Sequence, residues 1–85
     1  MFKNKFYDRN NICGETIFAL RNQKTADQKY ISQRKLADMM QLEGVALDKN
    51  QIQRIECGKR FVTDIELAAF AKVFNVSPDY LLRLR

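Results

Sequence analysis

The sequence predicts an all-α protein, a compact bundle of five helices. Four helix starts along the chain repeat the same capping arrangement, and no segment alternates polar and apolar residues as a strand does. A single Pro and three Gly leave few turns, while 46% hydrophobic residues can form a packed core. A chain of 85 residues has room for one domain. A domain of this size buries only a little over roughly 60% of its unfolded surface, so we expect modest stability.

The chain divides into an N-terminal arm, residues 1–10, and a single domain over residues 11–85. No apolar run approaches the roughly 20 residues of a membrane span. The polar start of the chain also lacks the apolar segment of a signal peptide, so we expect a cytoplasmic protein. Cys13 and Cys57 lie far apart without a CxxC spacing, which indicates reduced thiols. The aromatic side chains of Phe2, Phe6 and Tyr7 in the arm need cover.

The first helix is expected over residues 11–23. Its apolar stripe at helical spacing consists of Cys13, Thr16, Ile17 and Leu20, and Gly14 weakens its first turn. A polar loop follows over residues 24–31.

Each of the other four helices begins at a capping residue that stands between two apolar residues, the arrangement called a hydrophobic staple. The caps are Ser32, Asp48, Thr63 and Ser77, and their staple pairs are Ile31 with Leu36, Leu47 with Ile52, Val62 with Leu67, and Val76 with Leu81. These signals predict helices over residues 33–42, 49–57, 64–75 and 78–84. The last one has Pro78 at its first position, where the missing N–H has no cost.

Apolar residues at helical spacing form the expected core. They are Ile17, Leu20, Leu36, Ala37, Ile52, Ile55, Leu67, Phe70, Ala71 and Phe74. The last helix gathers Tyr80, Leu81, Leu82 and Leu84, which is more apolar surface than one short helix can bury. We interpret part of that surface as a dimer face.

The strongest functional signal lies in the segment from Asp48 to Arg60. Asp48 and Gln51 form a capping box, and the polar face of the helix that follows carries Lys49, Asn50, Gln53 and Arg54. Asn and Gln can pair bidentately with adenine, and Lys and Arg with guanine, so this face can read bases in a major groove. The alternative is the solvated face of an ordinary amphipathic helix. Gly58 then ends the helix, and Lys59 and Arg60 follow.

The net charge of +5 suits a polyanionic partner. Its surplus lies in residues 1–35, which hold eight Lys and Arg against three Asp and Glu, so charge alone does not locate the interface. Arg34 and Lys35 stand in the first turn of their helix, where cations oppose the helix dipole. Contact with phosphate would offset that cost. At Lys59 and Arg60 a cation also suits the helix end, and both roles can hold together.

Four motifs follow one another along the chain. They are Ser32-Gln33 with Lys35-Leu36-Ala37, then Ile52 to Glu56 with Gly58-Lys59-Arg60, then Glu66 to Phe74, then Val76-Ser77. Together they resemble the phage repressor and Cro family of helix-turn-helix regulators, over about residues 12–82. The resemblance implies a lambda-repressor-like DNA-binding domain. The helix over 33–42 would cross the DNA backbone, and the helix over 49–57 would enter the major groove.

The resemblance also implies roles for individual residues. Lys49, Asn50 and Arg54 fall where base edges are reached, with Gln53 more peripheral. The positions of Gln33, Lys59 and Arg60 imply contact with phosphates, and the same role is expected for Arg34 from its place in the first turn of its helix. Arg21 and Glu56 fall where the family has a largely buried structural ion pair. The connection from Leu42 to Leu47 is longer than the usual turn of roughly 3 to 4 residues. The extra length can tilt the helix over residues 49–57 relative to the major groove.

These observations predict a sequence-specific DNA-binding transcriptional regulator, a repressor that binds double-stranded DNA at an inverted repeat as a homodimer. The alternative is a protein-binding module of the same fold, such as an antitoxin that acts through a partner protein. An enzyme is not expected, because the chain has no His and its only serines, Ser32 and Ser77, serve as caps. No cofactor, metal site or membrane contact is expected.

Overall fold

The computed structural model describes residues 8–23 and 30–83. Within these ranges the chain forms five α-helices and no β-strand, which confirms the predicted fold class. The helices are α1 (Gly14–Arg21), α2 (Gln33–Leu42), α3 (Lys49–Glu56), α4 (Asp64–Phe74) and α5 (Pro78–Leu82). The aromatic residues of the arm, Phe2, Phe6 and Tyr7, lie outside the described residues, as do most of the polar loop and Leu84.

All four predicted caps are present. The side chain of each one accepts a hydrogen bond from the backbone N–H three residues later, at Ser32, Asp48, Thr63 and Ser77. The capping boxes of α3 and α4 are closed from both sides, because Gln51 and Glu66 accept from the backbone N–H of Asp48 and Thr63 at 2.9 and 3.0 Å. Each such cap stabilises a helix by roughly 1 kcal/mol.

The first helix is shorter than predicted. It begins at Gly14 rather than at residue 11, because the Asn11 side chain accepts from the Gly14 N–H at 2.8 Å and donates outside its own helix. At the other end, both the backbone and the side chain of Asn22 donate to the Phe18 carbonyl, which closes the helix.

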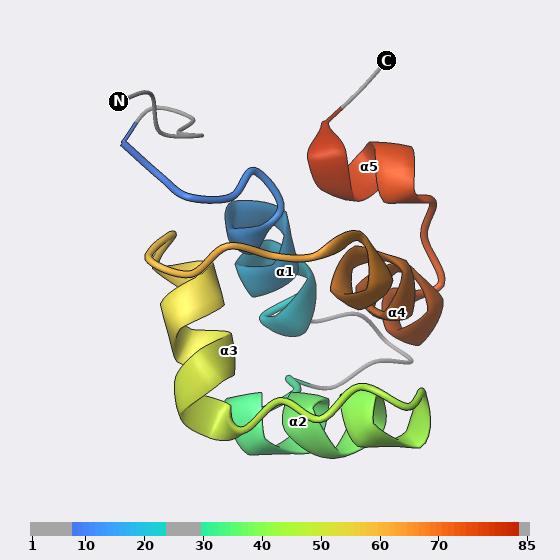
Figure 1. Ribbon diagram of the computed structural model, residues 1–85. Helices are drawn as coiled ribbons and strands as arrows, with labels where there is room; N and C mark the ends of the chain where they lie inside the picture. The colour runs from blue at the N-terminus through green and yellow to red at the C-terminus, as the bar shows by residue number, and fades with distance from the viewer. Residues whose placement is uncertain (1–7, 24–29, 84–85) are drawn as a thin grey trace.

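The helices enclose one core around α1. In Figure 1, α3 and α2 lie to one side of α1 and below it, and α4 and α5 lie to the other side. The largest fully buried side chains are Phe70, Ile17, Leu36, Met40, Ile52, Ile55 and Leu81. Leu81 therefore belongs to the core, and the proposed dimer face loses it. Its neighbour Tyr80 is exposed.

The long connection between α2 and α3 is held in place by its own apolar residues. Gly44 adopts a φ of +86°, which Gly tolerates, and the Gly44 and Val45 N–H groups donate to Gln41 and Met40. Val45 and Leu47 are buried, whereas Leu42 is exposed. The additional residues thus form an ordered turn that delivers the chain to the cap of α3.

Candidate nucleic-acid interface

The outer face of α3 carries the four side chains to which the sequence assigns base contact. Lys49, Asn50, Gln53 and Arg54 are all exposed, while Ile52 and Ile55 on the opposite face are completely buried. Among the described residues, no hydrogen bond or ion pair engages the side chains of Lys49, Asn50 or Arg54. Gln53 makes only a long contact, 3.5 Å, to the Cys57 sulfur. This face can therefore meet a partner without breaking internal bonds.

Two hollows flank α3 and bring the predicted residues of α2 beside those of α3. The first, about 550 Å³, is lined by Arg34 of α2 together with Lys49 and Asn50 of α3. The second, about 420 Å³, places Gln33 beside Gln53. Residues from the start of α2 thus lie beside residues of α3 in both hollows.

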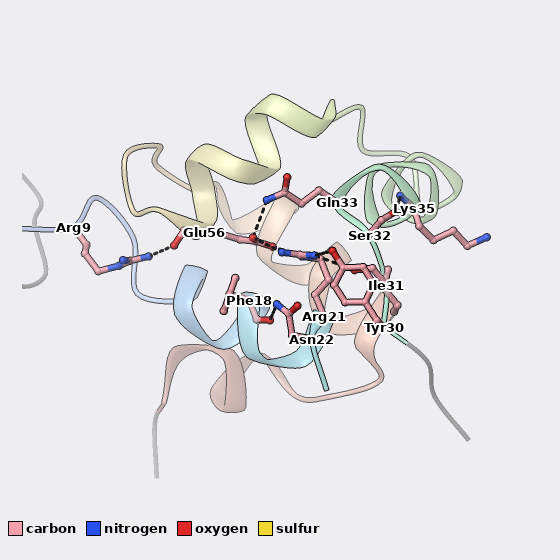
Figure 2. Close-up of polar contacts among 10 residues, drawn as sticks. All are labelled: Arg9, Phe18, Arg21, Asn22, Tyr30, Ile31, Ser32, Gln33, Lys35 and Glu56. Atoms are coloured by element: carbon pink, nitrogen blue, oxygen red, sulfur yellow. Dashed lines mark hydrogen bonds and ion pairs between the residues drawn. The ribbon is translucent and has the colours of Figure 1, made fainter. Parts of the chain in front are cut away.

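A buried ion pair anchors the far end of α3. The Arg21 guanidinium donates to the Glu56 carboxylate through Nε and Nη2, at 2.7 and 2.9 Å, and both side chains are only 4% exposed. The hydrogen bond to Glu56 raises the pKa of Arg21, although burial opposes the shift. Arg21 also donates to the Tyr30 hydroxyl at 3.0 Å and lies 5.5 Å from the Tyr30 ring centre. The pair therefore ties α1 to α3 as part of a larger network (Figure 2).

Gln33 joins the same network. Its side-chain amide donates to Glu56 Oε1 at 3.0 Å, so the carboxylate receives bonds from both α1 and α2 (Figure 2). An amide nitrogen carries two N–H groups, and this bond uses one of them. The structure thus fixes the orientation of Gln33 at the edge of the exposed surface.

The two cations after α3 lie in different environments. Lys59 is exposed, whereas Arg60 donates to both carboxylate oxygens of Glu66, at 2.9 and 3.1 Å. Burial alone would raise the pKa of Glu66, but hydrogen bonds from Arg60 and Thr63 together hold that pKa below its ordinary value. Both residues were predicted from the sequence to contact DNA phosphates. In the structure the Arg60 guanidinium is already paired within the protein.

Three further residues beside the site were not predicted from the sequence: Arg9, Asn10 and Asn11. The structure places all three against the end of α3, where they bind carbonyl groups of its last turn and of the turn that follows it. Two consecutive Asn residues before a helix were a usable signal, since Asn is a favoured capping residue. The partners, 44 to 49 residues away along the chain, could not be read from the sequence.

Other site chemistries find no support in the described ranges. No group of three potential metal ligands occurs there, and none of the helices there has the length and apolar character needed to cross a bilayer. Burial raises the pKa of the Cys13 thiol to about 11, which keeps it protonated. The second cysteine, Cys57, is exposed, and neither forms a disulfide.

Comparison with known proteins adds one finding. A protein-family model described as Helix-turn-helix matches residues 20–81, which include all of α2, α3 and α4 and most of α5. Neither a curated protein nor a solved structure matches the chain significantly.

Proposed function

Because the chain belongs to the Cro/C1-type helix-turn-helix family of DNA-binding regulators, we propose that it is a sequence-specific transcriptional repressor that binds an inverted-repeat operator as a homodimer. The observation that carries the proposal is the outer face of α3, whose four polar side chains are exposed, opposite a buried face formed by Ile52, Ile55 and the ion-paired Glu56. The proposed activity is binding, not catalysis.

In the proposed complex α3 enters the major groove and α2 crosses the backbone. Asn50 and Gln53 have amide groups that match adenine, and Lys49 and Arg54 have cations that match guanine. These four residues are the proposed base contacts, and a typical good bidentate pair contributes about 1–3 kcal/mol of discrimination between bases.

Phosphate contacts are proposed for Gln33, Arg34 and Lys59, which surround α3. Arg60 takes a supporting part, because its pairing with Glu66 leaves Lys59 as the exposed cation of the turn. Contacts of this kind fix the position of a protein on the duplex without reading its sequence.

The homodimer is proposed because one short reading helix makes few base contacts. Pairing two copies on half-sites about 34–36 Å apart, one helical turn, raises both affinity and specificity. Three large apolar side chains near α4 and α5 are more than half exposed, Phe61, Ile65 and Tyr80, and we propose that they contribute to that pairing.

The decisive experiment is selection of bound fragments from random duplex DNA, repeated at higher salt. We expect a two-fold symmetric motif that persists when salt weakens non-specific binding. Failure to enrich any motif would contradict the proposal. If the protein instead formed a tight complex with a second protein and bound DNA weakly, the antitoxin-like alternative would be favoured.

Lys59→Ala tests the docking. It should weaken binding to all sequences and lower the salt dependence, the slope of log K against log salt, by about one for each bound chain. Arg60→Ala is the matched control, since it removes a cation of the same turn that is paired internally. It should lower stability while leaving most of that slope in place.

A further inference from the structure

The segment Arg9–Asn11 lies across the C-terminal end of α3 and binds five carbonyl groups there. Arg9 Nη2 donates to the Glu56 carbonyl at 2.7 Å, and Asn10 donates through its backbone to Gly58 at 2.7 Å. The two Asn side chains bind the remaining three, with Asn10 donating to Lys59 and Asn11 to Ile55 and Arg60, at 2.8 to 3.0 Å. Figure 2 shows Arg9 approaching Glu56 from the side opposite Arg21 and Gln33.

Two of these five carbonyls, those of Ile55 and Glu56, belong to the last turn of α3, and the other three lie in the turn that follows it. The last carbonyls of an α-helix have no partner within the helix. The N–H groups of Gly58 and Lys59 donate to the Ile55 and Arg54 carbonyls, and the carbonyls of Gly58 and Lys59 accept from the backbone and side chain of Asn10. The guanidinium of Arg9 also brings positive charge to the negative end of the helix dipole.

Two glycines make the close approach possible. Gly58 has a φ of +80°, and a Cβ atom added there would lie 2.7 Å from the Arg9 guanidinium carbon. A Cβ atom added to Gly14 would collide with the Ile55 carbonyl oxygen. A side chain at Gly58 would displace the Arg9 side chain, and one at Gly14 would push α1 away from α3.

These contacts fix the backbone around Lys59. Its N–H is bound to the Arg54 carbonyl at 2.9 Å, its own carbonyl to the Asn10 side chain, and the carbonyl before it to the Asn10 backbone. The backbone of residue 59 is thus held on both sides while its side chain stays exposed. Fixing a contact residue before binding lowers the ordering cost of the complex.

We propose that Arg9–Asn11 is a positioning clamp for DNA binding, which sets the place of Lys59 and the end of α3 without touching DNA. The inference rests on the proposed function. It assigns to these residues an effect on affinity, beyond the stabilisation that any helix cap gives.

Asn10→Ala is the primary test, because the side-chain bond it removes is at the surface and its loss leaves the core intact. We expect affinity for the selected operator to fall by about twofold to tenfold, as loss of one hydrogen bond implies. The salt slope should fall as well. A neutral side chain releases no counterions of its own, so a lower slope would report a weakened contact of Lys59.

Asn11→Asp gives a second, independent variant. The aspartate keeps an oxygen that accepts from Gly14, but its second carboxylate oxygen faces the Ile55 and Arg60 carbonyls and is repelled by them, so the variant breaks the clamp and keeps the bond to α1. It should also lower the salt slope. In a Lys59→Ala background, neither variant should lower the slope further, because the contact is already gone.

Ser77→Ala is the matched control, since it removes a cap of α5 and no contact with α3. It should lower the melting temperature and leave the salt slope unchanged. If Asn10→Ala and Asn11→Asp retain the wild-type slope while Lys59→Ala lowers it, the clamp is overturned and the proposed function stands. If Lys59→Ala itself leaves the slope unchanged, Lys59 does not contact phosphate. The proposed arrangement on DNA is then wrong, and so is the clamp proposal that depends on it.

Discussion

The two ends of α3 differ in how they are held. At its start, Lys49 and Asn50 are exposed, and the backbone is organised locally by the capping box of Asp48 and by the buried Leu47 before it. At its end, Glu56 is buried and bonded to side chains of α1 and α2, and the carbonyls beyond it are bound by the segment before α1. A helix that presents side chains to a partner can leave one end free, provided that the other end is fixed to the body.

The difference also separates two kinds of interaction. The start of α3 is built from bonds that span three residues, whereas its end depends on partners 23 to 49 residues away. Local bonds suffice to begin a helix, but only distant ones can set its orientation. Substitution of the buried ion pair at the end should therefore cost stability, whereas substitution of an exposed side chain at the start, Lys49 or Asn50, should cost recognition and little stability.

The largest effect is expected from Arg21→Ala. Among the described residues it leaves Gln33 as the one side-chain donor to the buried Glu56 carboxylate, which should lower the free energy of unfolding by about 3–5 kcal/mol. Urea denaturation followed by circular dichroism measures the change. An unchanged midpoint would mean that the end of α3 is not anchored by this pair.

Asn50→Ala should show the opposite pattern. Binding to the selected operator should weaken by about 1–3 kcal/mol, with relaxed discrimination at one base position. Stability should stay within roughly 0.5 kcal/mol of the wild type, because the side chain is exposed. Titrations with single-base variants of the operator test this. Equal losses at every sequence would instead place Asn50 on the backbone of the DNA.

Glu66→Gln tests whether the ion pair between Glu66 and Arg60 stabilises the fold. Because its folded-state pKa is lowered from the ordinary value of 4.5, Glu66 stabilises the fold above that pH, and the contribution is lost as pH falls through the lowered pKa. The variant should be less stable than wild type by roughly 1 kcal/mol at neutral pH. The gap should close in acid, as thermal melts over a pH series would show. A gap independent of pH would exclude this ionisation as its source.

The smallest effect is expected from Lys72→Ala, an ion pair away from α3. Lys72 and Glu43 lie 3.7 Å apart, and the lysine side chain is 77% exposed. An exposed pair of this kind contributes between zero and about 1 kcal/mol, and we expect the low end. The same denaturation assay serves here. A loss as large as that of Arg21→Ala would show that burial does not distinguish the two pairs.

Much of the fold could be predicted from particular residues. Ser32, Asp48, Thr63 and Ser77 marked four helix starts correctly because a cap and its staple are contacts within one or two turns. The face of α3 was predictable for the same reason, since helical spacing alone separates Ile52 and Ile55 from Lys49 and Asn50. The start of α1 was not predictable in this way, because the Asn11 side chain donates to the Ile55 carbonyl of α3 and also accepts from the Gly14 N–H.

The sequence by itself determined the helix starts and the set of side chains that α3 presents, because both follow from interactions between near neighbours. The tertiary structure alone decided that Arg60 pairs with Glu66 while Lys59 stays exposed, and that Arg9–Asn11 covers the end of α3. Lys59 and Arg60 are both cations, so their residue types do not show which of them pairs with a carboxylate. Every residue has a backbone carbonyl, so the sequence likewise does not show which carbonyls are bound. Their partners are set only when the packed core brings distant segments together.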